Sequence, residues 1–152
     1  MVCLGNICRS PMADGLLRKK IEMNGLPVEV DSAGTNGYHA GEAPDERMRK
    51  TAKQFDTSID NLRARQFTSD DYDEFDIIYV MDQSNYDNVI SLARNEKDKQ
   101  KVKLILNESH PSKNLEVPDP YFGGEQGFVH VYQLLDEATD VVIDKLKSKI
   151  NA

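Results

Sequence analysis

Several residue types and patterns are scarce or missing in this sequence of 152 residues. Tryptophan is absent, cysteine occurs 2 times and histidine 3 times. There is no run of about 18 apolar residues, so we expect no membrane-spanning segment and no membrane partner. Positive charge is also in deficit, because the formal net charge is −7 and no basic stripe offsets it. This balance argues against a nucleic-acid-binding protein that works by neutralising phosphates.

The only cysteines, Cys3 and Cys8, cannot form the framework of several disulfides that stabilises small secreted proteins. No export signal is visible, so we expect a cytoplasmic, reducing compartment, where cysteines are more often catalytic or metal-binding. Metal binding is the weaker alternative, because His39, His110 and His130 are scattered without ligand spacing. We therefore expect neither a metal nor another cofactor, and we assign the histidines no role.

The chain does contain an alternation of strand and helix patterns. Short apolar segments predict strands over 28–34, 76–82 and 101–106, and residues 107–120 are expected to form a loop. Periodicity and capping signals predict helices over 10–24, 45–55, 84–95 and 128–146. Ser10 would cap the first of these helices and Ser84 the third. This alternation predicts a single α/β domain over 1–152, with a parallel sheet and right-handed crossovers.

Ligands of such sheets bind beyond the carboxyl ends of the strands. The turn at Ser32, the end of the strand at Asp82 and the loop around Asp119 would lie at that edge, together with the motif that opens the chain. Only two residues precede Cys3, whereas a buried strand needs about five. We therefore expect the first strand to begin before the first residue given.

The stretch from Cys3 to Ser10, CLGNICRS, has the features of an anion-binding loop that leads into a helix. Gly5 permits backbone angles that other residues resist, and successive N–H groups of such a loop can point inward at an anion. The helix N-terminus adds partial positive charge, and Arg9 offers a planar fork that matches two phosphate oxygens. Cys3 would lie beneath the anion as a thiolate, which is an in-line nucleophile for phosphorus. The stretch therefore predicts transfer of a phosphoryl group to sulfur, with phosphate or other oxyanions as ligands.

Each cysteine also has a purely structural interpretation. Cys3 could be a small buried hydrophobic residue, but that interpretation leaves Gly5 and Arg9 unexplained. For Cys8 two interpretations stay open. It packs beneath the loop, or its thiol traps oxidised Cys3 as a disulfide and so makes the oxidation reversible.

The reaction also needs an acid, because a phenol leaving group has a pKa of about 10 and departs poorly without a proton. Asp119 stands apart from the many other acids, because Pro118 and Pro120 stiffen its loop and two glycines follow. Tyr121 and Phe122 would form the wall of a slot for an aromatic ring. A plain surface turn is the alternative.

Together these residues resemble the low-molecular-weight protein tyrosine phosphatases. VCLGNICRSP at 2–11 and DPYFGG at 119–124 are similar to the family's end motifs, and DSAGT, ARQF and MDQSN follow the order of the blocks between them. The resemblance implies a four-stranded parallel sheet with helices on both faces and the phosphate-binding loop at its carboxyl edge. It implies metal-independent hydrolysis of protein phosphotyrosine through a cysteinyl phosphate, by a cytoplasmic enzyme whose partners are tyrosine-phosphorylated proteins.

The resemblance also implies roles for individual residues. Cys3 would be the nucleophile, Arg9 the phosphate clamp, and Asp119 the general acid and then the base for water. Asn6 and Ser32 would belong to a hydrogen-bond network that holds the loop. The other residues expected to bind substrate, steady the thiolate or support the site are Leu4, Gly5, Ile7, Cys8, Ser10, Tyr38, Asp82, Tyr121 and Phe122.

Two positions depart from the family's usual pattern. Leu62 stands where many members carry histidine, so the resemblance does not carry over one supporting hydrogen bond, although it leaves the expected chemistry unchanged. Asp14 replaces a more common glutamate, on what we expect to be the surface of the first helix.

Three rival functions fit the residues less well. An arsenate reductase can share the fold and the loop, but it needs further cysteines, and none follows Cys8. A phosphoarginine phosphatase tends to have threonine where Ile7 stands, and an apolar β-branched residue favours an aromatic ring over a guanidinium. A binding module without activity would be expected to lose the nucleophile or the acid, and both are present.

Overall fold

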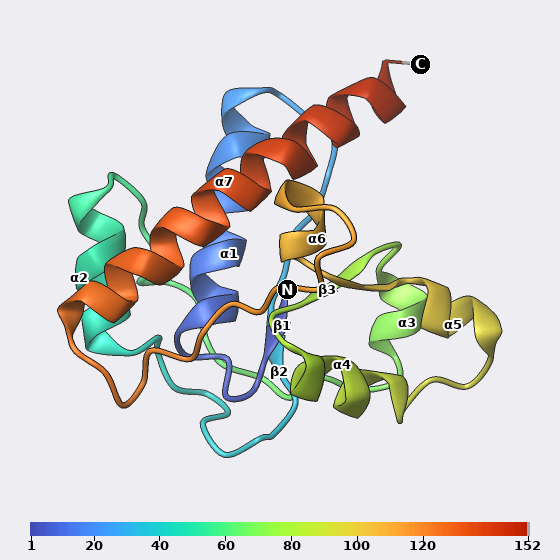
Figure 1. Ribbon diagram of the computed structural model, residues 1–152, viewed down its shortest axis with the longest axis horizontal. Coiled ribbons are helices and arrows are strands. Elements are labelled where there is room, and N and C mark those ends of the chain that lie inside the picture. Colours follow the sequence, from blue (N-terminus) through green and yellow to red (C-terminus); the bar gives the residue numbers. More distant parts are fainter. Residues whose placement is uncertain (152) are drawn as a thin grey trace.

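The computed structural model describes residues 1–151 of the chain. Within them a parallel sheet contains β1 (Val2–Cys3), β2 (Ala33–Gly34), β3 (Ile78–Val80) and β4 (Val102–Leu104). The order of the strands is β2-β1-β3-β4, so β1 is flanked on both sides. The four-stranded parallel sheet is therefore confirmed, and its strands lie near the middle of Figure 1.

Helices connect the strands and surround the sheet. They are α1 (Arg9–Met23), α2 (Glu46–Gln54), α3 (Asp71–Glu74), α4 (Gln83–Ile90), α5 (Glu96–Gln100), α6 (Leu106–Ser109) and α7 (Glu125–Ile150). The long helix α7 crosses diagonally over α1 (Figure 1), and the two helices pack against each other. Among residues 1–151, none of the helices combines the length and the apolar character that a membrane span needs.

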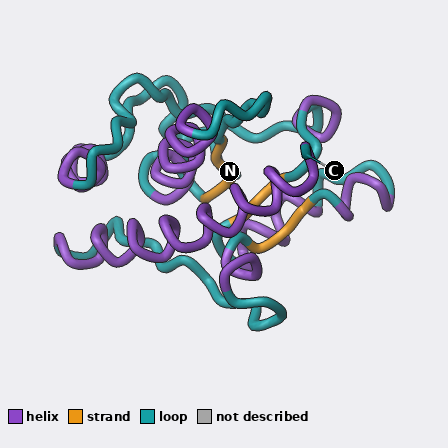
Figure 2. The backbone as a smooth tube through the Cα atoms, turned by 90° about the horizontal axis from the view of Figure 1, so that it is seen from above, coloured by secondary structure: helices purple, strands orange, loops and turns teal. Residues whose placement is uncertain are grey.

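Both faces of the sheet are buried, because side chains alternate between the two faces along each strand. Cys3 and Tyr79 pack with apolar residues of α1, α2 and α7. Ile78 and Val80 point the other way and pack with residues of α3 and α4. Figure 2 shows the strands in the interior with helices around them. The prediction of helices on both faces is confirmed.

The strands are shorter than the sequence patterns predict. β3 and β4 lie within the predicted ranges 76–82 and 101–106. Of the predicted strand 28–34, only Ala33–Gly34 pairs with a neighbour, so the prediction for 28–32 is wrong. A strand needs a hydrogen-bonded neighbour, and the adjacent β1 begins only at Val2.

Two helices begin at other residues than the capping signals predict. α1 begins at Arg9, so Ser10 lies inside its first turn, and the Ser10 hydroxyl bonds to the preceding loop instead of capping the helix. α4 is capped by Asp82, not by Ser84, because the Asp82 carboxylate accepts a hydrogen bond from the Asn85 N–H at 2.7 Å. The remaining predicted helices agree with α2 and α7 to within a few residues.

Three short helices have no counterpart in the predictions. α3, α5 and α6 span only 4, 5 and 4 residues, which is too short to produce a recognisable periodicity. The helix α6 also begins inside the segment 101–106 and continues into 107–120, so the prediction of a continuous loop after the last strand is wrong.

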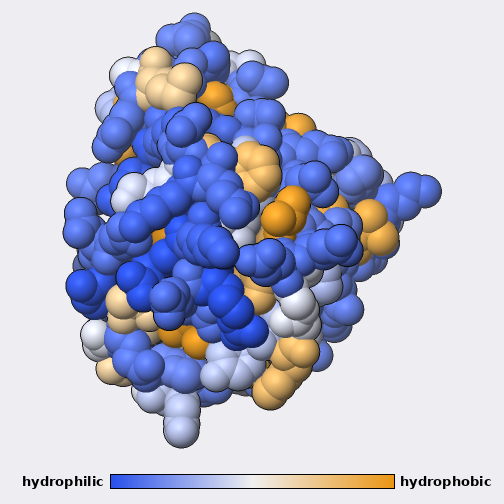
Figure 3. All heavy atoms as spheres, turned by 90° about the vertical axis from the view of Figure 1, so that its left-hand side faces the viewer, coloured by the Kyte–Doolittle hydropathy of each residue, from blue (hydrophilic) through white to orange (hydrophobic). Residues whose placement is uncertain are grey.

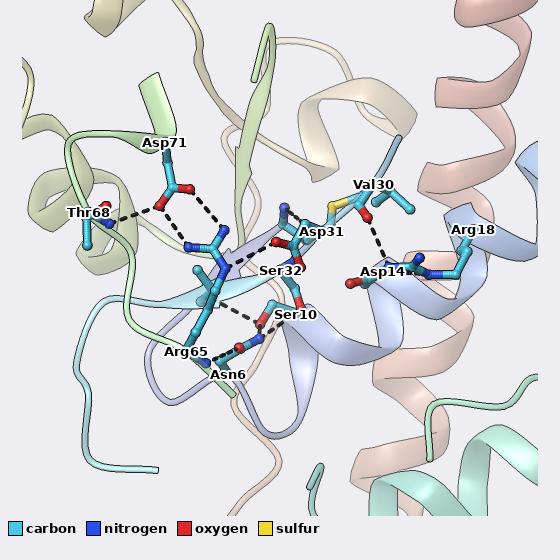
Figure 4. Close-up of polar contacts among 12 residues, drawn as sticks. Asn6, Ser10, Asp14, Arg18, Val30, Asp31, Ser32, Arg65, Thr68 and Asp71 are labelled. Carbon is cyan, nitrogen blue, oxygen red and sulfur yellow. Dashed lines mark hydrogen bonds and ion pairs between the residues drawn. The ribbon is translucent and has the colours of Figure 1, made fainter. Parts of the chain in front are cut away.

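The expectation that Asp14 lies on a helix surface is wrong as well. Its side chain is fully buried, and one carboxylate oxygen accepts hydrogen bonds from Arg18 Nε at 3.1 Å and Nη2 at 2.8 Å. The same guanidinium donates to the Val30 carbonyl at 2.9 Å, which ties α1 to the segment before β2 (Figure 4). Burial raises the pKa of Asp14, and the nearby Arg18 charge opposes this rise.

Candidate active site

The loop between β1 and α1 is folded around Asn6. The left-handed backbone expected at Gly5 occurs instead at Asn6, whose φ is 58°, in a region that asparagine tolerates better than most residues. This conformation directs its backbone N–H toward the Cys3 Sγ, at 3.3 Å. The Cys3 Sγ also lies 3.0 Å from the Ser10 hydroxyl, at the start of α1. The loop therefore gathers hydrogen-bonding groups around one sulfur atom.

The Asn6 side chain joins this loop to two other segments. Its amide nitrogen donates to the Ser10 hydroxyl at 2.8 Å and to the Ser32 hydroxyl at 3.0 Å. Its oxygen accepts from the Arg65 backbone N–H at 3.1 Å. All of these groups converge on the loop in Figure 4. Since Asn6 is 2% exposed, its bonds are shielded from water and hold the left-handed turn firmly.

Arg65 is itself anchored by its side chain. Its guanidinium pairs with Asp71 through two hydrogen bonds of 2.9 and 3.0 Å and with Asp31 at 3.1 Å (Figure 4). Burial by itself lowers the pKa of Arg65, but the contacts with Asp71 outweigh it and raise that pKa. The backbone N–H that Asn6 uses is therefore held in place by an ion-pair cluster.

The Arg9 guanidinium is buried behind the loop, with 3% of its side chain exposed. One of its nitrogens, Nη1, donates to the Asp82 carboxylate at 2.7 Å and to the Val117 carbonyl at 3.0 Å. Burial by itself lowers the pKa of Arg9, but Cys3 and Asp82 outweigh it and raise that pKa above its ordinary value. Arg9 therefore stays positively charged although little water reaches it.

The Asp119 carboxylate lies at the edge of the same site. It is 3.7 Å from Arg9 Nη2, and 44% of its side chain is exposed. Its other oxygen accepts a hydrogen bond from the Tyr121 N–H at 3.1 Å. The structure thus brings together Cys3, Arg9 and Asp119, the residues that the sequence singled out for catalysis.

The residues expected at the entrance differ in exposure. Tyr38 and Phe122 are 83% and 96% exposed, whereas Leu4 and Tyr121 are 43% and 37% exposed. The side chain of Ile7 is 9% exposed and belongs to the apolar core beneath the loop. The aromatic and aliphatic side chains expected at the entrance are therefore at least partly exposed, whereas Ile7 is buried.

Cys8 packs in the same core as Cys3. Both are free, buried thiols. Burial raises the pKa of the Cys8 thiol, so Cys8 is protonated at neutral pH and fills space as a small apolar residue. This packing agrees with the structural interpretation of Cys8, and the interpretation as a protecting thiol stays a prediction.

Several groups at the site were missed by the sequence reasoning. His39, to which no role was assigned, lies against the loop, since a Cβ added at Gly5 would come within 3.2 Å of its ring. The Val117 carbonyl and the Arg65 N–H are backbone groups, and the residue type does not indicate that such a group takes part in a site. For Arg65 the available signal was its place in the ARQF block.

The described residues bring together no group of three or more histidine, cysteine or acidic side chains that could hold a metal ion. A cavity of about 590 Å³ lies near the amino ends of the strands, beside Val30, Asp31 and Ile77. Neither Cys3 nor Asp119 lines it, so it is separate from the site described above.

Comparisons with known proteins agree with this geometry. The model of the family described as low molecular weight phosphotyrosine protein phosphatase matches residues 1–152. The human low molecular weight phosphotyrosine protein phosphatase is 39% identical over 135 residues, which cover 87% of this chain and 84% of that protein.

Two solved structures have the same fold. The crystal structure of protein tyrosine phosphatase from Entamoeba histolytica, with Hepes in the active site, has a TM-score of 0.90 and 41% identity, and covers 97% of this chain and 95% of that one. Vibrio vulnificus Wzb in complex with benzylphosphonate has a TM-score of 0.83 and 30% identity, and covers 95% and 94% of the two chains.

The ion pair between Arg9 and Asp82 generates a prediction about stability. Asp82→Asn keeps a side chain that can cap α4 but leaves the buried guanidinium without its closest anion. We expect the free energy of unfolding to fall by about 1–3 kcal/mol. Inorganic phosphate should recover more stability in this variant than in the parent, because a bound anion replaces the missing charge.

Thermal unfolding with and without phosphate measures both effects. Asp87→Asn is the matched control, since it removes one carboxylate from the exposed face of the same helix. An Asp82→Asn variant that is as stable as this control would show that the ion pair contributes little.

Proposed function

The chain belongs to the low molecular weight phosphotyrosine protein phosphatase family and hydrolyses phosphotyrosine, and we propose that Cys3, Arg9 and Asp119 carry out this reaction. One observation carries the assignment. A single loop bears the thiol and the buried guanidinium, and that guanidinium lies 3.7 Å from the Asp119 carboxylate. A nucleophile, a phosphate clamp and a proton donor are therefore within reach of one phosphate ester.

In the first step, the loop N–H groups and Arg9 bind the oxygens of the phosphate. The Cys3 thiolate attacks phosphorus in line, so that an S–P bond forms while the P–O bond to the tyrosine oxygen breaks. Asp119 gives its proton to that oxygen, and the product leaves as a neutral phenol. Ser10 and Asn6, which contact the sulfur, keep the thiolate in position for this attack.

In the second step, water hydrolyses the cysteinyl phosphate. Asp119, now a carboxylate, takes a proton from the water as its oxygen attacks phosphorus. The new P–O bond forms, the S–P bond breaks, and inorganic phosphate and the thiolate are released. No step requires a metal ion, because Arg9 and the backbone N–H groups neutralise the charge on the phosphate.

The proposed substrates are tyrosine-phosphorylated proteins that present their side chain to the entrance. Tyr121, Phe122, Tyr38 and Leu4 are exposed apolar or aromatic groups there, and they suit an aromatic ring. We also propose that Ile7 beneath the loop favours that ring over a guanidinium. The benzylphosphonate complex of the Vibrio vulnificus relative supports an aryl group at this entrance. A cytoplasmic location fits the free thiols, which a reducing compartment preserves.

Replacing the nucleophile tests the proposal first. Cys3→Ser should lower kcat by at least about a thousandfold, because a serine hydroxyl in the same place stays protonated and attacks poorly. The variant should still bind vanadate or inorganic phosphate, since the loop N–H groups and Arg9 are intact. Hydrolysis of para-nitrophenyl phosphate is the measurement, and EDTA should leave the parent's rate unchanged. Activity of Cys3→Ser within tenfold of the parent would contradict the assignment.

Replacing the acid tests the second role. Asp119→Asn should lower kcat/KM for phenyl phosphate by about 10²–10⁴-fold, which is the usual contribution of a general acid. The loss for para-nitrophenyl phosphate should be much smaller, because nitrophenolate leaves well without a proton. Equal losses for the two esters would mean that Asp119 only shapes its loop.

A further inference from the structure

The segment that carries Asp119 has few bonds to the rest of the protein. Within the described residues, the hydrogen bonds made by 119–124 join near neighbours in sequence, such as the Gly123 N–H with the Pro120 carbonyl and the Gly127 N–H with the Gly124 carbonyl. The contact of Asp119 with Arg9, at 3.7 Å, is longer than a hydrogen bond. Packing contacts therefore help to hold this segment, among them that of the buried Pro120.

Arg47, on α2, provides such a contact. Its guanidinium carbon lies 5.4 Å from the centre of the Tyr121 ring and 4.7 Å from the centre of the Phe128 ring. At these distances a cation is attracted to the face of an aromatic ring. Tyr121 follows Asp119 by two residues and donates its N–H to the Asp119 carboxylate at 3.1 Å. A shift of the Tyr121 ring therefore moves the acid as well.

Arg47 is fixed at its other end. Its guanidinium donates two hydrogen bonds to Asp45, at 3.0 and 2.9 Å, and this fork leaves it little rotational freedom. The Asp45 N–H donates to the Ile7 carbonyl at 2.8 Å, so Asp45 is attached to the loop that contains Cys3. A continuous path of contacts runs from the nucleophile's loop through Arg47 to the acid's segment.

The surroundings of Arg47 leave it available for this role. Its side chain is 44% exposed, on the face formed by α2 and the first turns of α7. This face is turned to the viewer in Figure 3, where the surface is largely hydrophilic with scattered apolar side chains. In such a surface the stack of Arg47 on Tyr121 is a local anchor and not part of an apolar core.

We propose that Arg47 is a positioning residue, which holds the Asp119 segment over the site through the Tyr121 ring. The inference rests on the proposed role of Asp119 as general acid. It goes beyond that role, because it assigns the placement of the acid to a residue of a different helix. Arg47 touches no reacting atom, so its effect on the rate must depend on how much the leaving group needs the acid.

Arg47→Met keeps the apolar stem and removes the planar cation. We expect kcat/KM for phenyl phosphate to fall by about three- to tenfold, because losing one such contact lowers the population of protein with Asp119 correctly placed by about that factor. The value for para-nitrophenyl phosphate should change by less than about twofold, since this ester needs the acid less. Arg47→Lys, which keeps a cation but loses the fork to Asp45, should give an intermediate loss for phenyl phosphate.

The controls separate positioning from a general structural effect. Lys53→Met removes a positive charge from the exposed face of the same helix and should change neither ester's kcat/KM. Inhibition by inorganic phosphate should be the same in Arg47→Met and the parent, because the phosphate loop is intact. If Arg47→Met unfolds at the assay temperature, Arg47→Lys carries the same comparison.

The double variant Arg47→Met, Asp119→Asn decides the assignment. If Arg47 acts through the acid, removing it in the Asp119→Asn background should cause no further loss for phenyl phosphate. Equal losses for both esters in Arg47→Met, while Asp119→Asn alone discriminates between them, would overturn this inference and leave the proposed function intact. If Asp119→Asn alone does not discriminate, the role of Asp119 fails, and the inference fails with it.

Discussion

The left-handed turn at Asn6 is the constraint on which the site depends. A loop can point its N–H groups at one anion only if its chain reverses sharply, and the φ of 58° at Asn6 makes that reversal. The turn is stable because the Asn6 side chain is buried and bonded to Ser10, Ser32 and Arg65. Two other segments of the chain, at Ser32 and Arg65, are thereby tied to the loop, and the fold around it holds the thiol still before any substrate arrives.

The charges around this loop suit the dianion of the proposed mechanism. The Arg9 guanidinium stays charged inside the protein because Cys3 and Asp82 outweigh burial and raise its pKa. Its other nitrogen faces Asp119 at a longer distance of 3.7 Å. The positive charge is therefore paired closely through Nη1, whereas Nη2, the nitrogen that would bind phosphate in the proposed mechanism, has only the longer contact.

The parts of this arrangement that are local in sequence were predictable. The loop from Cys3 to Arg9 is contiguous, so the spacing of its residues carries the chemistry, and Asp119 was marked by the prolines on either side. The alternation of strand and helix patterns predicted the parallel sheet with helices on both faces. Ser10 misled the prediction of the helix start, because its hydroxyl bonds to the loop and does not cap the helix.

What depends on distant contacts was not predictable. The Arg65 N–H and the Val117 carbonyl are backbone groups that reach the loop only through the fold, and a sequence pattern says nothing about them. Asp14 was expected at the surface, because acidic residues are rarely buried. Its burial depends on the ion pair with Arg18, which no pattern in the sequence indicates.

The central claim, that Cys3 carries the phosphoryl group, is tested most directly by acid-quenching the enzyme during turnover of phosphotyrosine and mapping the modified peptide by mass spectrometry. The account predicts one phosphoryl group on Cys3, and a phosphoryl group on any other residue, or none under conditions of turnover, would contradict it.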